Sequence, residues 1–377
     1  MISYLFIFGR TPELSWQEIL SLYPKAKRIR DNIAMISTVS ELPLAVIGNL
    51  GGVVKIARVI GASKEISAEV FYRYIPKSDA RIIFSISSMD GHIKTDSLVL
   101  GLKNLLATGN RHVRYIQPKH GESLSSVIVS RENVYELLIM LSGDKYVIGH
   151  TEIVQPYQDF GRRDFGRPHA DTKSGMLPPK VALMAINIAL HPPFSDLTLY
   201  DPFCGMGTIL AEGLRLGLKC TGSDFSADTI RKCGENLAWL KSTGIVNQPS
   251  FFNLIVSEAT HVSEFVSALS VDAIVTEPFM GTPRLGEHQV DDDKIKNIVK
   301  GLEKLYLGCF REWYKILKSG GTIMIALPTI VGKRGKYSVK KVIDTCENLG
   351  YTKVLGPIAY GRPQAIVIRD FYLFKKN

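Results

Sequence analysis

The eight-residue stretch Asp201–Thr208, with the sequence Asp-Pro-Phe-Cys-Gly-Met-Gly-Thr, constrains the fold of this chain more than any other segment. It follows a short apolar run, 197–200, that predicts a buried strand, and it precedes a helix-like segment, 209–216, that closes at Gly217. A strand, a tight glycine turn and a helix N-terminus form a ligand cradle, because glycines let backbone N–H groups approach a bound molecule. The stretch therefore predicts an α/β domain that binds a ligand at this turn.

The residues of the turn indicate which ligand. Asp201 would repel a pyrophosphate, whereas it attracts the ammonium group of an amino-acid moiety. The glycine spacing also differs from the dinucleotide fingerprint, since Gly205 and Gly207 are followed by Leu210 where a third glycine or alanine is expected. A dinucleotide oxidoreductase is therefore disfavoured. The stretch resembles the cofactor loop of methyltransferases that use S-adenosylmethionine, and in that interpretation Asp201, Phe203, Gly205 and Gly207 contact the cofactor.

Composition sets the broad class of protein. The chain has 377 residues, 45% of them hydrophobic, and a formal net charge of +10. This length predicts two or three domains, and the basic balance fits a polyanionic partner without requiring one. No apolar run is long enough for a transmembrane helix, and the N-terminus lacks the features of a signal peptide. Five cysteines without a CxxC pair predict no metal site and a cytoplasmic protein.

The second half alternates between strand-like and helix-like segments. Strands are predicted at 219–224, 251–256, 272–276 and 321–327 and helices at 226–243, 295–317 and 339–349, with two closing strands at 351–355 and 365–374. This alternation predicts a Rossmann-like, doubly wound parallel sheet, and the helix-free connection between the last two strands predicts an antiparallel edge. Asp201, Asp224, Glu258 and Glu277 each follow a predicted strand. Because such sheets bind ligands at the carboxyl ends of their strands, we expect the four acids at one edge.

The acids after the second and third strands suit the rest of the cofactor. The two oxygens of the Asp224 carboxylate match the two hydroxyl donors of a ribose. Glu258 is placed to accept a hydrogen bond from an adenine amino group, with Ala259 lining the ring. A helix-capping role for Asp224 and plain solvation of Glu258 are the alternatives.

Thr276–Gly281, with the sequence Thr-Glu-Pro-Phe-Met-Gly, is the predicted chemical centre. Methyl transfer to an exocyclic amine needs an acceptor for the N–H, because the nitrogen lone pair is delocalised into the ring. Glu277 is the candidate acceptor, Pro278 fixes the backbone, and Phe279 is the candidate for stacking on the base. The alternative is a purely structural turn at the end of a strand.

The first half carries no such cluster of catalytic residues. Short apolar runs at 4–8, 53–60, 82–86 and 126–129 mix with helix-like patches at 96–106 and 133–141, which predicts an α+β region. Basic and aromatic residues interleave there, and they form either a solvated face or an RNA-contacting surface: Arg73, Tyr74, Arg111, Arg114, Tyr115 and Lys119. A polar stretch rich in Pro and Gly follows and predicts an interdomain linker.

Four segments together resemble the THUMP-containing tRNA guanine-10 N2-methyltransferases: 175–180, Asp201–Gly205, Gly222–Asp224 and Thr276–Gly281. The resemblance implies a ferredoxin-like domain at 1–65, a THUMP-like RNA-binding domain at 66–155, a linker at 156–174 and a Rossmann-like methyltransferase domain at 175–377. It also implies that the protein binds tRNA and methylates the 2-amino group of a guanosine. It gives no indication of a partner protein subunit.

The chain departs from the family at one point. The family motif is an Asp or Asn, two prolines and an aromatic, whereas this chain has Glu277, one proline, Phe279 and Met280. The motif is therefore a functional variant with the stacking residue one position early, or it marks a changed target or lost activity. Methylation of another RNA or DNA base amine, and a non-catalytic RNA-binding adaptor that retains the cofactor, are the alternative functions.

Overall fold

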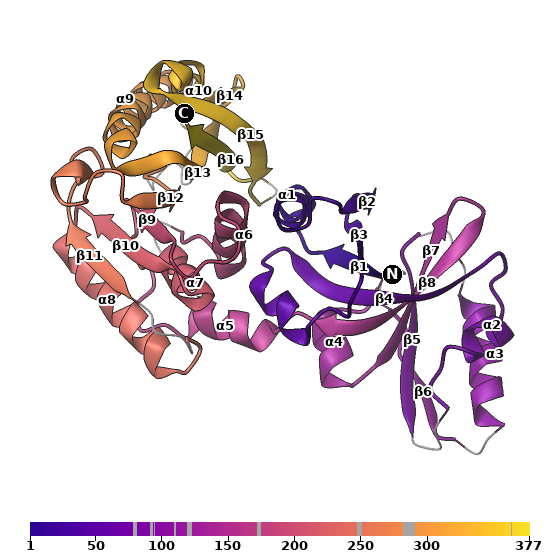
Figure 1. The fold of residues 1–377 in the computed structure, drawn as a ribbon. Helices are drawn as coiled ribbons and strands as arrows, with labels where there is room; N and C mark the ends of the chain where they lie inside the picture. Colours follow the sequence, from indigo (N-terminus) through magenta and orange to yellow (C-terminus); the bar gives the residue numbers. More distant parts are fainter. Residues whose placement is uncertain are drawn as a thin grey trace. The chain divides into compact units, whose positions relative to one another are not determined.

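The chain divides into two compact units, Met1–Gln158 and Asp159–Asn377, which are described separately (Figure 1). The computed structural model describes all of residues 1–377 except 78–80, 91–92, 94, 109–110, 119–122, 172–174, 247–250, 282–290 and 363. Lys119 and the last three residues of the predicted linker therefore lie outside the described residues. Among the described helices, none is both long and apolar enough to cross a membrane.

The first unit is built on one eight-stranded sheet with the order β2-β3-β1-β4-β8-β7-β5-β6. Strand β5 runs parallel to β6 and β7, and the other neighbours are antiparallel. The strands are β1 (Ile2–Phe8), β2 (Lys27–Arg30), β3 (Ile33–Thr38), β4 (Val53–Ser63), β5 (Ile82–Ser88), β6 (Val113–Tyr115), β7 (Tyr135–Ser142) and β8 (Lys145–Val154). The helices are α1 (Pro12–Leu22), α2 (Ala68–Tyr72), α3 (Asp96–Ala107) and α4 (Ser126–Arg131).

One prediction for this unit is wrong, since the helix-like patch 133–141 forms strand β7. The apolar run 126–129, for which no element type was predicted, lies in helix α4. In β7, Leu137 and Ile139 belong to one buried cluster and Leu138 and Met140 to another. Because successive side chains of a strand point to opposite faces, a strand covered on both faces carries apolar residues on both. Its sequence then lacks the alternation that separates strands from helices.

The interleaved basic and aromatic residues of the first unit divide by burial. Tyr74 and Tyr115 are partly buried and pack against the cluster formed by α2, α3, β5 and β7. Arg114 is exposed and pairs with Glu132 at 3.1 Å, and Arg73 is exposed. The aromatic rings thus support the core, whereas these arginines lie at the surface.

The second unit contains the predicted doubly wound sheet, with the order β11-β10-β9-β12-β13-β16-β15 and β14 paired to β13. Strands β9 to β13 are parallel, and β16 is antiparallel to both of its neighbours, β13 and β15, which confirms the predicted antiparallel edge. The strands are β9 (Thr198–Asp201), β10 (Lys219–Asp224), β11 (Phe252–Val256), β12 (Val271–Thr276), β13 (Leu317–Val331), β14 (Lys336–Ser338), β15 (Tyr351–Tyr360) and β16 (Val367–Lys376).

Helices cover both faces of this sheet. They are α5 (Tyr157–Phe165), α6 (Pro179–Ala189), α7 (Thr208–Leu216), α8 (Ala227–Ser242), α9 (Asp292–Ile316) and α10 (Lys340–Thr345). In β9, Tyr200 belongs to the buried cluster formed with α9, whereas Leu199 lies against Gly213 of α7. Since neighbouring residues of a strand face opposite ways, α9 and α7 lie on opposite faces of the sheet, as Figure 1 shows.

Several predicted boundaries needed correction. Strand β13, Leu317–Val331, extends beyond the predicted 321–327 at both ends. At its start the chain enters the strand directly after α9 and passes through Gly320, whose φ is +73°. The pairing of β12 with β13 shifts register at this point, so the glycines form an irregularity within a strand. Strand β15 runs on to Tyr360, and the predicted linker contains helix α5.

Candidate functional site

Asp201 ends strand β9 and is 2% exposed. The Thr276 hydroxyl donates to its Oδ1 at 2.7 Å, and the backbone N–H of Phe203 donates to the same oxygen at 3.1 Å. Burial raises the pKa of Asp201 to about 7 despite these two hydrogen bonds, and the charges of Asp224 and Glu277 add to the rise. Among the described residues none donates to Oδ2, which leaves that oxygen for a cationic ligand.

The glycine turn after Asp201 has the backbone that the sequence predicts. Gly205 and Gly207 have φ of +49° and +84°, values that favour glycine. A Cβ on Gly207 would lie 2.7 Å from Cys233 Sγ, so this position also has no room for a side chain. Gly207 is the N-cap of α7 and provides no side-chain cap, which leaves the first N–H groups of the helix without a capping side chain.

Phe203 contributes to the site through its backbone N–H, which donates to Asp201. Its half-buried ring packs edge-on against Trp313, with centroids 6.5 Å apart and planes at 82°. The ring therefore anchors the turn to the core around α9, while its N–H orients Asp201.

Asp224 ends strand β10, beside the glycine turn. Its carboxylate accepts hydrogen bonds from the backbone N–H of Ser226, at 3.0 Å, and from the backbone of Gly205. Burial raises the pKa of Asp224, and both hydrogen bonds lower it. The capping role considered from the sequence falls to Ser226, whose hydroxyl accepts from Thr229 at the start of α8. Asp224 therefore braces the turn and keeps a partly exposed carboxylate beside it.

Phe225 was not predicted as a site residue, yet its ring is 78% exposed directly after Asp224. Phe225 lies at the carboxyl edge of the sheet, where such sheets bind ligands, and an aromatic ring can stack on a flat one. The signal in the sequence was an aromatic immediately after the acid.

Glu258 and Ala259 follow β11, next to β10 in the sheet. The backbone N–H of Ser257 donates to the carbonyl of Asp224 at 3.1 Å, which ties the two strand ends together. Ala259 is buried, whereas the Glu258 side chain is 71% exposed and lies 3.6 Å from His261 Nδ1. Glu258 is therefore at the predicted edge but is oriented mainly by solvent and His261.

Glu277 lies at the end of β12, one residue after the Thr276 that contacts Asp201. Its side chain is 14% exposed, and Arg369 Nε of β16 donates to its Oε1. Burial raises the pKa of Glu277, while the charge and hydrogen bond of Arg369 lower it. Pro278 is buried, and the Phe279 side chain is 52% exposed. The structure thus brings Asp201, Asp224 and Glu277 to one edge, with exposed aromatic rings beside two of them.

Among the described residues, no group of three His, Cys, Asp or Glu side chains is arranged to hold a metal ion. The three acids at this edge instead suit a ligand that offers an ammonium, hydroxyl groups or an amine.

The fold of this chain is similar to that of a protein of known structure. The chain has a Rossmann-like domain preceded by an α+β unit, and this fold extends over the whole of TrmN from Thermus thermophilus, with a TM-score of 0.56, 14% identity and coverage of 100% of both chains. No family model matches the chain.

In sequence, the chain is related to tRNA (guanine(10)-N2)-dimethyltransferases. The protein of that name from Pyrococcus abyssi is 27% identical over 214 residues, which cover 57% of this chain and 52% of that protein. Its counterpart from Methanothermobacter thermautotrophicus is 28% identical over 193 residues, which cover 50% and 49%. The chain thus matches these curated relatives over about half of their length.

Proposed function

We propose that this protein transfers a methyl group from S-adenosylmethionine to the exocyclic 2-amino group of a guanosine in tRNA. The observation that carries the proposal is the convergence of Asp201, Asp224 and Glu277 at the carboxyl edge of one sheet, around a glycine turn. The relationship to the tRNA (guanine(10)-N2)-dimethyltransferases supports the choice of reaction and substrate.

The residues at this edge fit S-adenosylmethionine, which supplies an electrophilic methyl group when bound. Oδ2 of Asp201 accepts the ammonium of the methionyl moiety, and Asp224 accepts the ribose hydroxyls. Gly205 and Gly207 leave the backbone open to the ligand because neither carries a Cβ.

The adenine is assigned to the neighbouring strand ends. Ala259 lines the ring, Glu258 accepts from its amino group, and the exposed ring of Phe225 covers one face. Glu258 is the weakest of these contacts because its carboxylate is largely hydrated.

Glu277 acts on the target amine. One of its oxygens accepts an N–H of the 2-amino group, which draws the nitrogen lone pair out of conjugation and stabilises the positive charge that develops on methylation. Pro278 fixes the turn, and the exposed ring of Phe279 stacks on the guanine. Glu277 then holds or relays the proton that the amine loses.

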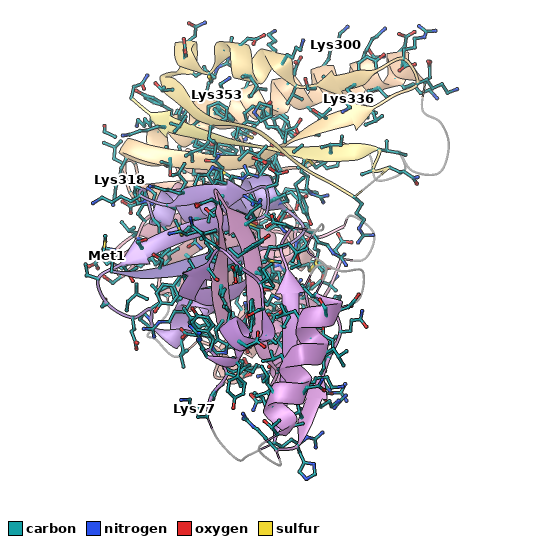
Figure 2. All side chains as sticks on the ribbon, turned by 90° about the vertical axis from the view of Figure 1, so that its right-hand side faces the viewer. Met1, Lys77, Lys300, Lys318, Lys336 and Lys353 are labelled. Carbon is teal, nitrogen blue, oxygen red and sulfur yellow. The ribbon has the colours of Figure 1, made fainter. Side chains whose placement is uncertain are left out.

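The tRNA is bound through phosphate contacts by both units. The net charge of +10 favours a polyanion. Three lysines of the second unit that Figure 2 labels are exposed: Lys300, Lys336 and Lys353. Residues 1–65 are assigned as a ferredoxin-like domain and 66–155 as a THUMP-like RNA-binding domain. The protein is assigned to the cytoplasm, where tRNA is modified.

The test is a methyl-transfer assay with purified protein, methyl-labelled S-adenosylmethionine and bulk tRNA, followed by digestion and mass identification of the labelled nucleoside. We expect the label in N2-methylated guanosine. Label in another nucleoside would support a different base amine. If the protein binds cofactor and tRNA but transfers no label, the adaptor interpretation replaces the enzyme.

A further inference from the structure

Arg369 lies in β16, far from the segments that the sequence points to. It donates from Nε to Oε1 of Glu277 and from Nη2 to the backbone carbonyl of Gly175, at 3.5 Å. The Arg369 side chain is 21% exposed. One guanidinium therefore connects three segments: the end of β12, strand β16 and the chain just before α6.

Sheet register explains how this arginine reaches the site. Thr276 lies beside Ile325 of β13, and Arg369 lies beside Pro328, three residues further along the same strand. Strand β16 thus extends past the end of β12 and presents Arg369 beyond Thr276, where Glu277 begins the next turn.

The ion pair occupies one oxygen of Glu277. None of the described residues donates to Oε2, so that oxygen is available to a substrate N–H. A planar guanidinium fixes the direction of a carboxylate better than a flexible ammonium does, because its N–H groups have a rigid geometry.

The other end of the turn is held independently. The hydroxyl of Tyr306, a fully buried residue of α9, donates to the carbonyl of Phe279 at 2.5 Å. The turn is thus fixed at its carboxylate by β16 and at its backbone by α9.

We propose that Arg369 is a positioning residue for methyl transfer, which holds Glu277 through Oε1 so that Oε2 faces the target amine. This inference rests on the proposed function. It assigns to Arg369 no contact with the substrate, only the orientation of the group that makes that contact.

The charge of Arg369 also governs when Glu277 ionises. Facing this site are the carboxylate of Asp201 from β9, the phenol of Tyr306 from α9 and the phenol of Tyr360 from β15. Arg369 is the cation that lowers the pKa of Glu277 against burial, so its removal raises that pKa. The acidic limb of the pH–rate profile then moves to higher pH.

The experiment compares Arg369→Met, Arg369→Lys and Lys375→Met with the wild type in single-turnover and steady-state methyl transfer. Lys375 is the matched control, since it is an exposed cation of the same strand, placed beside Thr322 at the other end of β13. We expect Arg369→Met to lower the rate of transfer by about 10- to 100-fold with a tRNA KM within about threefold of wild type. We expect Arg369→Lys to restore part of the rate and Lys375→Met to change it little.

A double-mutant cycle with Glu277→Gln gives the readout that a merely structural role would not produce. If Arg369 acts through Glu277, then Arg369→Met in the Glu277→Gln background lowers the rate no further. Equal, additive losses in both backgrounds, or a loss confined to tRNA KM, would overturn the proposal and make Arg369 a phosphate contact.

A measurement without catalysis separates this inference from the proposed function. Carboxyl-¹³C NMR of labelled glutamate, with Glu277 assigned from its loss in Glu277→Gln, follows the titration of that carboxyl. A higher titration midpoint in Arg369→Met than in wild type supports the pair, and an unchanged midpoint refutes it. An inactive wild type would refute the proposed function while this titration still decided whether Arg369 holds Glu277.

Discussion

Two buried acids, Glu136 in the first unit and Asp201 in the second, are held in different ways. In the first unit, Glu136 of β7 is fully buried and receives the ammonium of Lys55, which donates at 2.9 and 2.8 Å to its two oxygens. The hydroxyls of Ser87 and Thr151 each donate to it at 2.7 Å. Lys55 donates as well to the carbonyl of Leu124, at 2.9 Å.

In the second unit, Asp201 is as thoroughly buried but receives two donors on a single oxygen and no cation among the described residues. The pKa of Asp201 is raised because burial outweighs these two hydrogen bonds. Burial alone therefore does not mark an acid as functional. A buried acid whose oxygens are all satisfied stabilises the fold, whereas one with unused acceptor capacity at a sheet edge is available to a ligand.

The largest expected effect comes from breaking the buried Lys55–Glu136 ion pair. Glu136→Ala leaves the Lys55 ammonium buried without its counter-charge, and the free energy of unfolding of the first unit should fall by about 3–5 kcal/mol. Hydrogen exchange followed by mass spectrometry resolves the two units and should show faster exchange in β4 and β7. Glu41→Ala, which removes an exposed partner of Arg58, serves as the control and should change exchange little. Unchanged protection in Glu136→Ala would contradict a structural role for this pair.

The next effect concerns catalysis in the second unit. Glu277→Gln should lower the rate of methyl transfer by about 10²-fold, because the amide keeps an acceptor but loses the charge that stabilises the positive nitrogen. Calorimetry should show nearly unchanged cofactor affinity. Glu277→Asp tests whether a shorter side chain still reaches the target amine. Retained activity means that the extra methylene of glutamate is tolerated, and lost activity means that the pocket requires the longer side chain. A Glu277→Gln variant as active as wild type would remove Glu277 from the mechanism.

A somewhat smaller effect is expected for cofactor affinity. Asp224→Ala should weaken binding of S-adenosylhomocysteine by about 1.5–3 kcal/mol, the scale of lost hydrogen bonds to a charged group. Glu258→Ala is the matched comparison, and its loss should be smaller because Glu258 is largely exposed. The assignment of Asp224 to the ribose would be wrong if Glu258→Ala weakened binding more than Asp224→Ala.

The smallest effect is a pH dependence. The folded-state pKa of Asp201 is about 7 against a usual 3.8, so between about pH 4 and pH 7 the carboxyl is ionised mainly in the unfolded state. The free energy of unfolding therefore falls as pH rises through this range. An ammonium ligand binds the ionised form, so affinity for S-adenosylhomocysteine should rise through pH 7, by at most about tenfold per pH unit. Calorimetry between pH 6 and 8 measures this rise, which Asp201→Asn should abolish. A slope that persists in Asp201→Asn belongs to another group.

The second unit was predicted well because its signals are local. The strand before Asp201, the glycine turn and helix 209–216 reappear as β9, the turn and α7 within one residue. The helix predicted at 295–317 reappears as α9, Asp292–Ile316, and packs its apolar residues into the core. In the first unit, β7 was missed because a strand buried on both faces carries no alternation.

The parts of the site that escaped prediction depend on distant contacts. Arg369 is 92 residues from Glu277 and meets it only through the register of β12, β13 and β16. Likewise, the bond from Tyr306 to Phe279 depends on how α9 packs, which no spacing reveals. Sequence motifs located the carboxyl edge and its acids, but the cation that faces Glu277 required the folded sheet.

We propose that Asp201, Asp224 and Glu277, at the carboxyl edge of the second unit's sheet, form a site for S-adenosylmethionine. Calorimetry of the wild-type chain at about pH 8, where Asp201 is ionised, tests it with S-adenosylhomocysteine and NAD as competing ligands. We predict that S-adenosylhomocysteine binds and that its affinity falls in Asp224→Ala, whereas NAD shows no binding. Tighter binding of NAD than of S-adenosylhomocysteine would contradict the claim.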